Sequence, residues 1–225
     1  MKAGYVKRFS PVERLLHWVN ALGFFFLLGT GLILYVPRLS VLVSRRQTIQ
    51  AWHFWAGVAW LCVLAAVLLL GGRRLLATAR ELDTFDRDDL RWLLRRRRAP
   101  QGRFNAGQKI NAILTAAFTI LFGVSGLLLW FGEQDTRLRF ASTVILHDGL
   151  MYVSLVLLVG HLYLALIHPA TRHALRGMTL GTVRVEWATR HHAKWEPEGV
   201  HIDRPEARNI PQPTPQLADA DRTRR

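Results

Sequence analysis

The 225-residue chain is 50% hydrophobic, yet it carries a formal net charge of +14. These two properties are compatible only if charged and apolar residues are segregated, and four long apolar runs do alternate with basic segments. This pattern is typical of an integral membrane protein and excludes a single soluble hydrophobic core as the organising feature.

The four apolar runs cover residues 15–36, 51–72, 110–131 and 143–167. Each contains about 20 residues or more, enough for a helix to span a hydrocarbon core of roughly 30 Å. We therefore predict an all-α membrane protein, a four-transmembrane-helix bundle. Charged residues precede the first run closely and no small-residue cleavage site follows it, so we expect a retained helix and not a signal peptide.

The basic residues predict the orientation of the bundle. Four lysines and arginines lie in the first 14 residues, eleven at 71–109 and ten at 168–225, against three at 36–52 and two at 132–146. The positive-inside rule therefore places both termini and the 73–109 loop in the cytoplasm. Attraction to anionic lipid accounts for the four arginines at 95–98, so we expect no nucleic-acid partner.

The segments outside the membrane are short. An apolar set in the 73–109 loop predicts a short interfacial helix, which the sequence Pro-Gln-Gly at 100–102 ends: Leu82, Phe85, Leu90, Trp92 and Leu93. The tail at 196–225 is Pro-rich and predicted to be extended or disordered when free. Residues 1–195 thus form one four-helix domain, without a repeat or a separate soluble domain.

The residue types limit the redox chemistry. The single cysteine, Cys62, excludes a four-cysteine iron–sulfur cluster on this chain, and the sequence has no covalent c-type haem motif. Four of the nine histidines lie inside or at the edge of an apolar run, where an ionisable side chain is costly and often functional: His17, His53, His147 and His161.

The spacing of these histidines matches two sites at different depths. His147 and His161 are 14 residues apart, which in a helix separates them by roughly 21 Å on nearly one face. His53 opens the second run at the outer end, level with His147, whereas His17 opens the first run at the inner end, level with His161. Two imidazoles at each depth would hold two haems b as saturated, low-spin electron carriers.

Other residues admit two interpretations. His168 lies on nearly the same face as His161 and is an alternative ligand, although an interfacial role is favoured because Pro169 follows it. We expect His173, His191, His192 and His201 to be solvated or to face partners. Small residues in the runs would admit a flat macrocycle or close helix packing: Gly23, Gly29, Gly31, Gly57, Gly123, Gly126, Gly149 and Gly160.

Three motifs then identify a family. They are Glu-Arg-Leu-Leu-His-Trp at 13–18, Phe-Asn-Ala-Gly-Gln-Lys at 104–109, and a tail pattern from Gly177 through His191-His192 to Trp195. Together they resemble the cytochrome b (gamma) subunits of membrane-bound respiratory formate dehydrogenases, over residues 6–195. Asp148 and the tail after Trp195 depart from the pattern.

The resemblance implies two haems b held by His17 with His161 and by His53 with His147. It also implies a quinone site beside the inner haem, formed by Asn105, Gly107, Gln108 and Lys109. An iron–sulfur subunit would deliver electrons to the outer haem, and a molybdenum- or tungsten-containing subunit would oxidise formate outside the membrane. The expected location is the bacterial inner (cytoplasmic) membrane, with several passes.

Alternatives stay open at the level of the sequence. The histidines also fit a di-haem subunit of another respiratory oxidoreductase, such as a nickel–iron hydrogenase, or a haem-free membrane anchor or transporter. Asn105 and Gln108 also fit an N-cap and its N3 partner. Glu13 would accept a hydrogen bond from His17 or form an exposed ion pair with Arg8 or Arg14, and these arginines would meet haem propionates or anionic lipid.

Overall fold

The computed structural model describes residues 4–41, 43–94 and 99–197. The predictions for the arginines at 95–98, for His201 and for the tail beyond 197 concern residues outside these ranges. The described helices and strands are, in chain order, β1 Tyr5–Lys7, α1 Pro11–Tyr35, α2 Pro37–Ser40, α3 Arg46–Asp83, α4 Arg87–Leu93, α5 Ala106–Gln134, η1 Thr136–Leu138, α6 Ala141–Leu162, η2 Tyr163–Ile167, η3 Arg172–Ala174, α7 Leu175–Leu180, β2 Thr182–Arg184 and α8 Val185–His191.

Among the described residues, four helices are long and apolar enough to cross a membrane: α1, α3, α5 and α6 with its continuation η2. The predicted all-helical fold with four membrane helices is confirmed. Each helix is longer than its apolar run. The helical backbone breaks at Gly72, with φ of 40° and ψ of −124°, which is where the second predicted span ends. A second helical segment, included in α3, then extends to Asp83 within the stretch predicted as a loop. Strong helix formers after Gly72, chiefly Leu, Ala and Arg, explain the extension.

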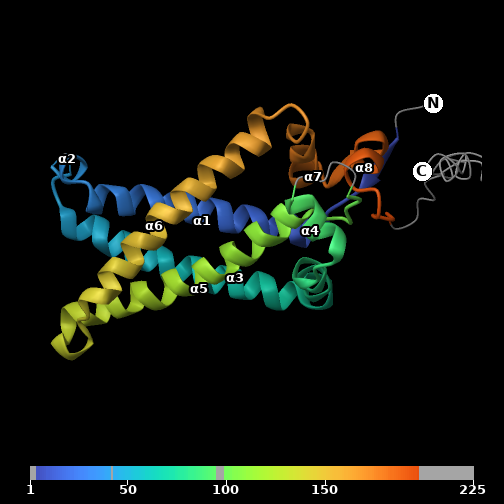
Figure 1. The fold of residues 1–225 in the computed structure, drawn as a ribbon. Helices are drawn as coiled ribbons and strands as arrows, with labels where there is room; N and C mark the ends of the chain where they lie inside the picture. The colour runs from blue at the N-terminus through green and yellow to red at the C-terminus, as the bar shows by residue number, and fades with distance from the viewer. Residues whose placement is uncertain (1–3, 42, 95–98, 198–225) are drawn as a thin grey trace, which may run out of the picture.

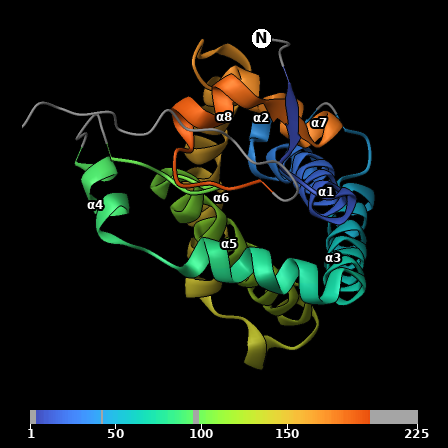
Figure 2. The ribbon, with the colours of Figure 1, turned by 90° about the vertical axis from the view of Figure 1, so that its right-hand side faces the viewer.

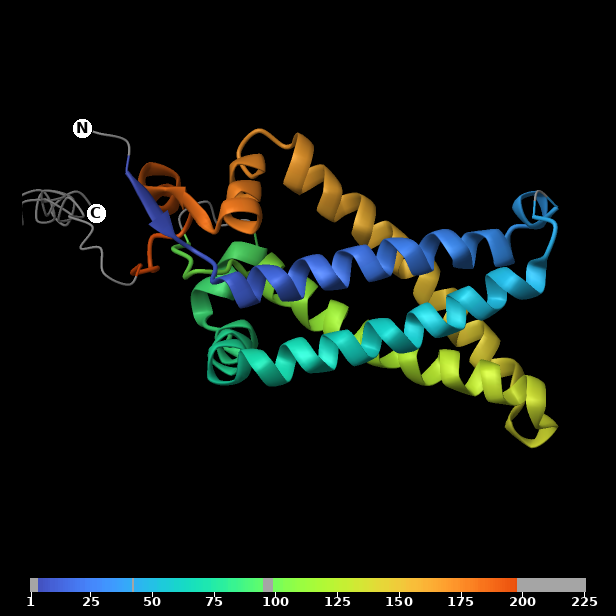
Figure 3. The same ribbon diagram turned by 180° about the vertical axis from the view of Figure 1, so that it is seen from behind.

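The long helices lie roughly along one axis, with α1 and α3 running antiparallel side by side and α6 leaning across the bundle (Figure 1). The view from behind shows the same pairing of α1 with α3 (Figure 3). The short elements β1, α4, α7 and α8 gather at one end, whereas α2 and η1 lie at the other (Figure 1). One end of the bundle therefore carries most of the structure outside the apolar spans.

A small sheet joins the two ends of the described chain. Strands β1 and β2 pair antiparallel, with Val6 opposite Val183. Val6, Val183 and Ala188 form a buried cluster, against which Trp187 and other partly buried side chains pack. Seen from this end, β1 lies between α7 and α8 (Figure 2). The sequence does not predict this sheet, because strands of three residues show no period-2 pattern that can be distinguished from a loop.

Capping boxes begin the helices that meet at this end. Ser10 caps α1 with Glu13, Asp86 caps α4 with Asp89, and Asn105 caps α5 with Gln108. The buried Glu13 carboxylate also accepts from Thr78 Oγ1 at 2.6 Å and from Arg103 Nη1 at 2.7 Å. The predicted contact of Glu13 with His17, or an exposed pair with Arg8 or Arg14, is therefore wrong.

Candidate functional site

The structure brings the four predicted histidines together in two pairs. His53 on α3 faces His147 on α6, with ring centroids 6.3 Å apart. His17 on α1 faces His161 on α6, with ring centroids 6.2 Å apart. The pairs are those that the depth argument predicts, and α6 contributes one member to each.

Both separations fit one metal ion between two imidazoles. An imidazole nitrogen bonds a transition metal at about 2.0–2.1 Å and its ring centroid lies about 1.1 Å further away, so two trans ligands place their centroids about 6.3 Å apart. The observed 6.3 Å and 6.2 Å agree with this value. The residues present therefore fit an iron with two axial histidines at each depth.

A cavity of about 490 Å³ adjoins the outer pair and is lined by residues of α1, α3, α5 and α6, His53 and His147 among them. Five glycines on three helices line it: Gly31, Gly57, Gly123, Gly126 and Gly132. A Cβ on Gly31 would stand 3.3 Å from His53 Cε1, so a side chain would crowd the imidazole. The volume of the cavity lies in the range of cofactor pockets, which is roughly 300–1,000 Å³.

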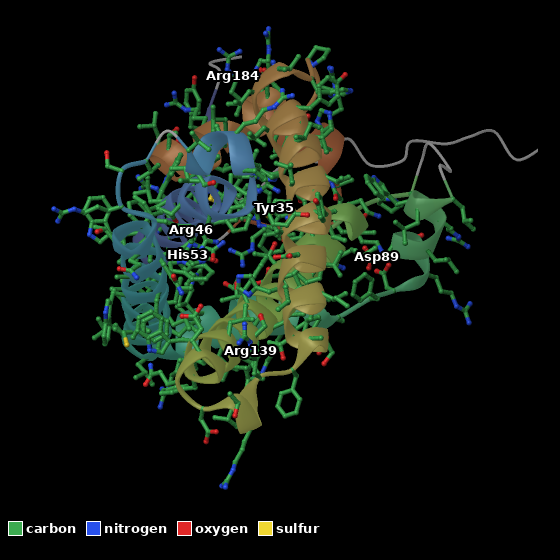
Figure 4. The ribbon with its side chains drawn as sticks, turned by 90° about the vertical axis from the view of Figure 1, so that its left-hand side faces the viewer. Tyr35, Arg46, His53, Asp89, Arg139 and Arg184 are labelled. Atoms are coloured by element: carbon green, nitrogen blue, oxygen red, sulfur yellow. The ribbon has the colours of Figure 1, made fainter. Side chains whose placement is uncertain are left out.

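Arginines line this cavity at the end of the bundle that holds α2 and η1. Arg46 from α3 and Arg139, which follows η1, both line it together with Tyr35. Viewed from the end that holds α2 and η1, the labelled Tyr35, Arg46, His53 and Arg139 lie around one region between the helices (Figure 4). Glu133 and Asp148 line the cavity as well, so both signs of charge are present beside its apolar walls. The two arginines are the residues that could pair with the acidic edge of a flat, apolar cofactor.

Two hydroxyl groups complete the outer site. Thr30 Oγ1 on α1 lies 2.8 Å from His53 Nδ1, and Ser125 Oγ on α5 lies 2.8 Å from His147 Nδ1. Sequence analysis did not select them. The sequence feature that could have indicated them is a hydroxyl residue next to glycine inside an apolar run, at Gly-Thr-Gly 29–31 and Ser-Gly 125–126.

The stretch predicted to bind quinone opens α5. Asn105 Oδ1 accepts from Gln108 N at 2.9 Å, and Gln108 Oε1 accepts from Asn105 N at 3.1 Å, so the capping interpretation is confirmed. Both contacts use only the amide oxygens. Within the described ranges, neither Asn105 Nδ2 nor Gln108 Nε2 has a hydrogen-bond acceptor, which leaves two donors for a ligand carbonyl. Capping and ligand binding are therefore compatible.

The other two residues of the stretch face α4. A Cβ on Gly107 would stand 3.1 Å from Trp92 Cη2, so the indole covers this turn of the backbone. Lys109 Nζ donates to Asp89 Oδ2 at 2.7 Å and to Thr84 O at 2.8 Å. The structure thus holds Lys109 in an almost buried ion pair with α4.

A buried arginine lies beside this stretch. The Arg8 guanidinium, 2% exposed, donates through Nη2 to Arg103 O at 2.8 Å and to Gln108 Oε1 at 3.3 Å. Burial, and then the charge of Arg103, lower the pKa of Arg8 to about 9. The prediction that Arg8 contacts anionic lipid is therefore wrong, because the Arg8 side chain is enclosed by protein.

The expectation that His192 is solvated is also wrong, because the residue is 2% exposed. Its Nδ1 lies 2.6 Å from Gly102 O, which can only accept, so Nδ1 carries the proton and Nε2 accepts from Arg8 Nη2 at 3.1 Å. Burial, and then the charge of Arg8, lower the pKa of His192 to about 3. His192 and Gln108 thus hold Arg8 from two sides.

Comparison with known proteins identifies the family. A sequence model of the prokaryotic cytochrome b561 family matches residues 8–181. The chain belongs to this family. The matched range contains both histidine pairs and the start of α5. Membership in a cytochrome b family implies haem b, so the haem-free alternative is not supported.

Curated relatives of this cytochrome b561 family member cover nearly the whole chain. The cytochrome b556(Fdn) subunit of the nitrate-inducible formate dehydrogenase of Escherichia coli K12 is 23% identical over 221 residues, covering 92% of this chain and 96% of the relative. The cytochrome b556(fdo) subunit of the same organism is 26% identical, covering 84% and 91%. The formate dehydrogenase cytochrome b556 subunit of Haemophilus influenzae is 24% identical, covering 86% and 83%. The resemblance deduced from the three motifs is confirmed.

His168, the alternative to His161 as a haem ligand, does not face a second histidine. His168 Nδ1 lies 3.2 Å from Thr171 Oγ1, and its ring packs against Tyr163. This position, after the end of η2, agrees with the favoured interfacial role. The histidines that meet in pairs within the long helices are those selected by the spacing argument.

Proposed function

We propose that this cytochrome is the membrane-anchoring di-haem cytochrome b subunit of a formate dehydrogenase. It would pass electrons from an iron–sulfur subunit through an outer and an inner haem b to a membrane quinone. The observation that carries the proposal is the pair of stacked histidine sites, each with the separation of two trans imidazole ligands. Similarity to formate dehydrogenase cytochrome b556 subunits over 84–92% of the chain supports the assignment to formate.

The outer haem would be held by His53 and His147 and the inner haem by His17 and His161. A haem b held by the two histidines of each pair would supply a one-electron carrier. The two positions on α6 are 14 residues apart, or roughly 21 Å along the helix. One carrier would then lie toward each membrane surface.

Electrons would leave at the start of α5. Asn105 Nδ2 and Gln108 Nε2 are the donors that would bind a quinone carbonyl, because their oxygens are already used in the cap. Gly107 and Lys109 line the same turn, with Lys109 paired to α4. Reduction of a quinone takes up protons as well as electrons.

The orientation follows from charge. The basic segments lie at the end that holds β1, α4, α7 and α8, so the positive-inside rule supports a cytoplasmic location for both termini and for the quinone site. The cytochrome would then be a multi-pass protein of the bacterial inner membrane. Its partners would be the iron–sulfur subunit, a molybdenum- or tungsten-containing catalytic subunit on the outer side, quinone and the lipid bilayer.

Purification of the intact complex from native membranes in mild detergent tests the proposal. We expect about two haems b per chain by pyridine haemochrome assay, co-purification of an iron–sulfur subunit and a formate-oxidising subunit, and reduction of both haems by formate. Reduction by hydrogen but not by formate would assign the cytochrome to a hydrogenase instead. One haem per chain in the intact complex would refute the di-haem assignment.

A further inference from the structure

Each imidazole of the outer pair has a side-chain hydroxyl group within hydrogen-bond distance of its Nδ1 atom. Thr30, 8% exposed, lies 2.8 Å from His53 Nδ1, and Ser125, 0% exposed, lies 2.8 Å from His147 Nδ1. The hydroxyls come from α1 and α5, whereas the histidines come from α3 and α6. All four long helices therefore contribute one residue to this arrangement.

The direction of both hydrogen bonds follows from the neighbouring carbonyls. Thr30 Oγ1 lies 3.0 Å from Phe26 O, and Ser125 Oγ lies 2.6 Å from Leu121 O, one helical turn back. A carbonyl oxygen can only accept, so each hydroxyl directs its single proton to the backbone and offers a lone pair to Nδ1. Nδ1 then carries the imidazole proton, and the lone pair of Nε2 is free to bind iron.

The inner pair lacks this arrangement. Across residues 4–41, 43–94 and 99–197, no hydrogen bond joins His17 or His161 to another side chain or to the backbone outside its own helix. The ring of His17 contacts Trp18 and His161 instead. The two sites therefore have the same ligands and the same spacing but different neighbours at Nδ1.

We propose that Thr30 and Ser125 are positioning residues of the outer haem site, and that they lower the reduction potential of the outer haem below that of the inner haem. This inference rests on the proposed di-haem function. Accepting a hydrogen bond from Nδ1–H fixes the tautomer and makes the imidazole a stronger electron donor. Stronger donation stabilises ferric over ferrous iron, which lowers the potential. An electron that enters at the outer haem would then move to the inner haem downhill.

The test uses Thr30→Val and Ser125→Ala in the intact complex, with potentiometric titration of the haem α-band. Thr119→Val is the matched control, because Thr119 Oγ1 also donates to a carbonyl of α5, at 2.9 Å, and has no hydrogen bond to an imidazole. We expect both variants to move the same one of the two haem transitions to a more positive potential, while the other transition and the control stay unchanged. The double variant should move that transition further.

Several results would overturn the inference. They are unchanged potentials at two haems per chain, shifts of different transitions in the two variants, or an equal shift in Thr119→Val. If Thr30→Val loses a haem, Thr30→Ser decides: retention of the haem and its potential supports the hydroxyl role, and loss overturns it. Fewer than two haems in the unmodified complex would instead refute the proposed function, so the two failures are distinguishable.

Discussion

The two amide side chains that open α5 can be tested without removing their caps. Gln108→Glu keeps an oxygen to accept from Asn105 N and places a carboxylate beside Arg8 Nη2, now 3.3 Å from the amide oxygen. Asn105→Asp keeps the oxygen that accepts from Gln108 N at 2.9 Å. Both changes preserve shape and replace the nitrogen donors that we assign to the quinone by carboxylate oxygens, which also adds one negative charge in each variant.

The structure sets the expected magnitudes. Asp caps helices about as well as Asn, and Glu is a favoured N3 residue, so helix stability should stay within about 0.5 kcal/mol. Loss of one hydrogen bond to a quinone carbonyl costs on the order of 1 kcal/mol, which is roughly a fivefold decrease in turnover. Gln108→Ala would add a second cost, because the buried Arg8 would lose an acceptor, about 1–3 kcal/mol.

The assay is formate-dependent quinone reduction per haem, measured beside the thermal unfolding midpoint of the same preparation. We expect turnover to fall several-fold in Gln108→Glu and Asn105→Asp while the midpoint and haem content are retained. Thr115→Val, a hydroxyl change two turns further along α5, serves as the control. Unchanged turnover in both variants would show that this stretch is a helix start without a role in quinone binding.

Three further predictions concern the haem ligands and the buried charges. His53→Ala should remove one haem and leave the inner haem reducible by dithionite, and His17→Ala should remove the other, as pyridine haemochrome assay and the two titration transitions would show. If one variant abolished both haems in a folded protein, the sites would not be independent. Arg103→Met should destabilise the protein by on the order of 3 kcal/mol in thermal unfolding, because the carboxylate of Glu13 is buried and loses its 2.7 Å partner; a loss below 1 kcal/mol would contradict this. Burial lowers the pKa of His192 to about 3, so the unfolded chain binds a proton that the folded chain excludes. The stability from this residue is therefore full above about pH 6.5 and falls by about 2 kcal/mol at pH 5, a slope that His192→Gln should remove.

Spacing and hydropathy predict the parts of this protein that depend on one helix at a time. The four spans follow from run length. The two ligand positions on α6 follow from the 14-residue interval between His147 and His161. The cap formed by Asn105 and Gln108 also depends only on neighbours in sequence. Each of these features is encoded within about one helix, where periodicity carries the information.

Features that join distant segments could not be predicted. Arg8 meets Gln108 across 100 residues and His192 across 184 residues, and no local pattern specifies either contact. His192 was expected in water because its neighbours in sequence are polar, but burial depends on Gly102 and Arg8, which fold around it. Thr30 is selected only when the position of His53 on a different helix is known.

The pairing of β1 with β2 constrains the order in which the protein is completed on the ribosome. Arg8 is made early, yet its partner His192 follows 184 residues later. At roughly 5–20 residues per second, about 10 to 40 s of synthesis separate them. During that interval all four spans emerge before Val183 can pair with Val6. A chain cut short before Thr182 would leave β1 unpaired and Arg8 without its contact to His192, so this end of the bundle can close only after synthesis has passed His192.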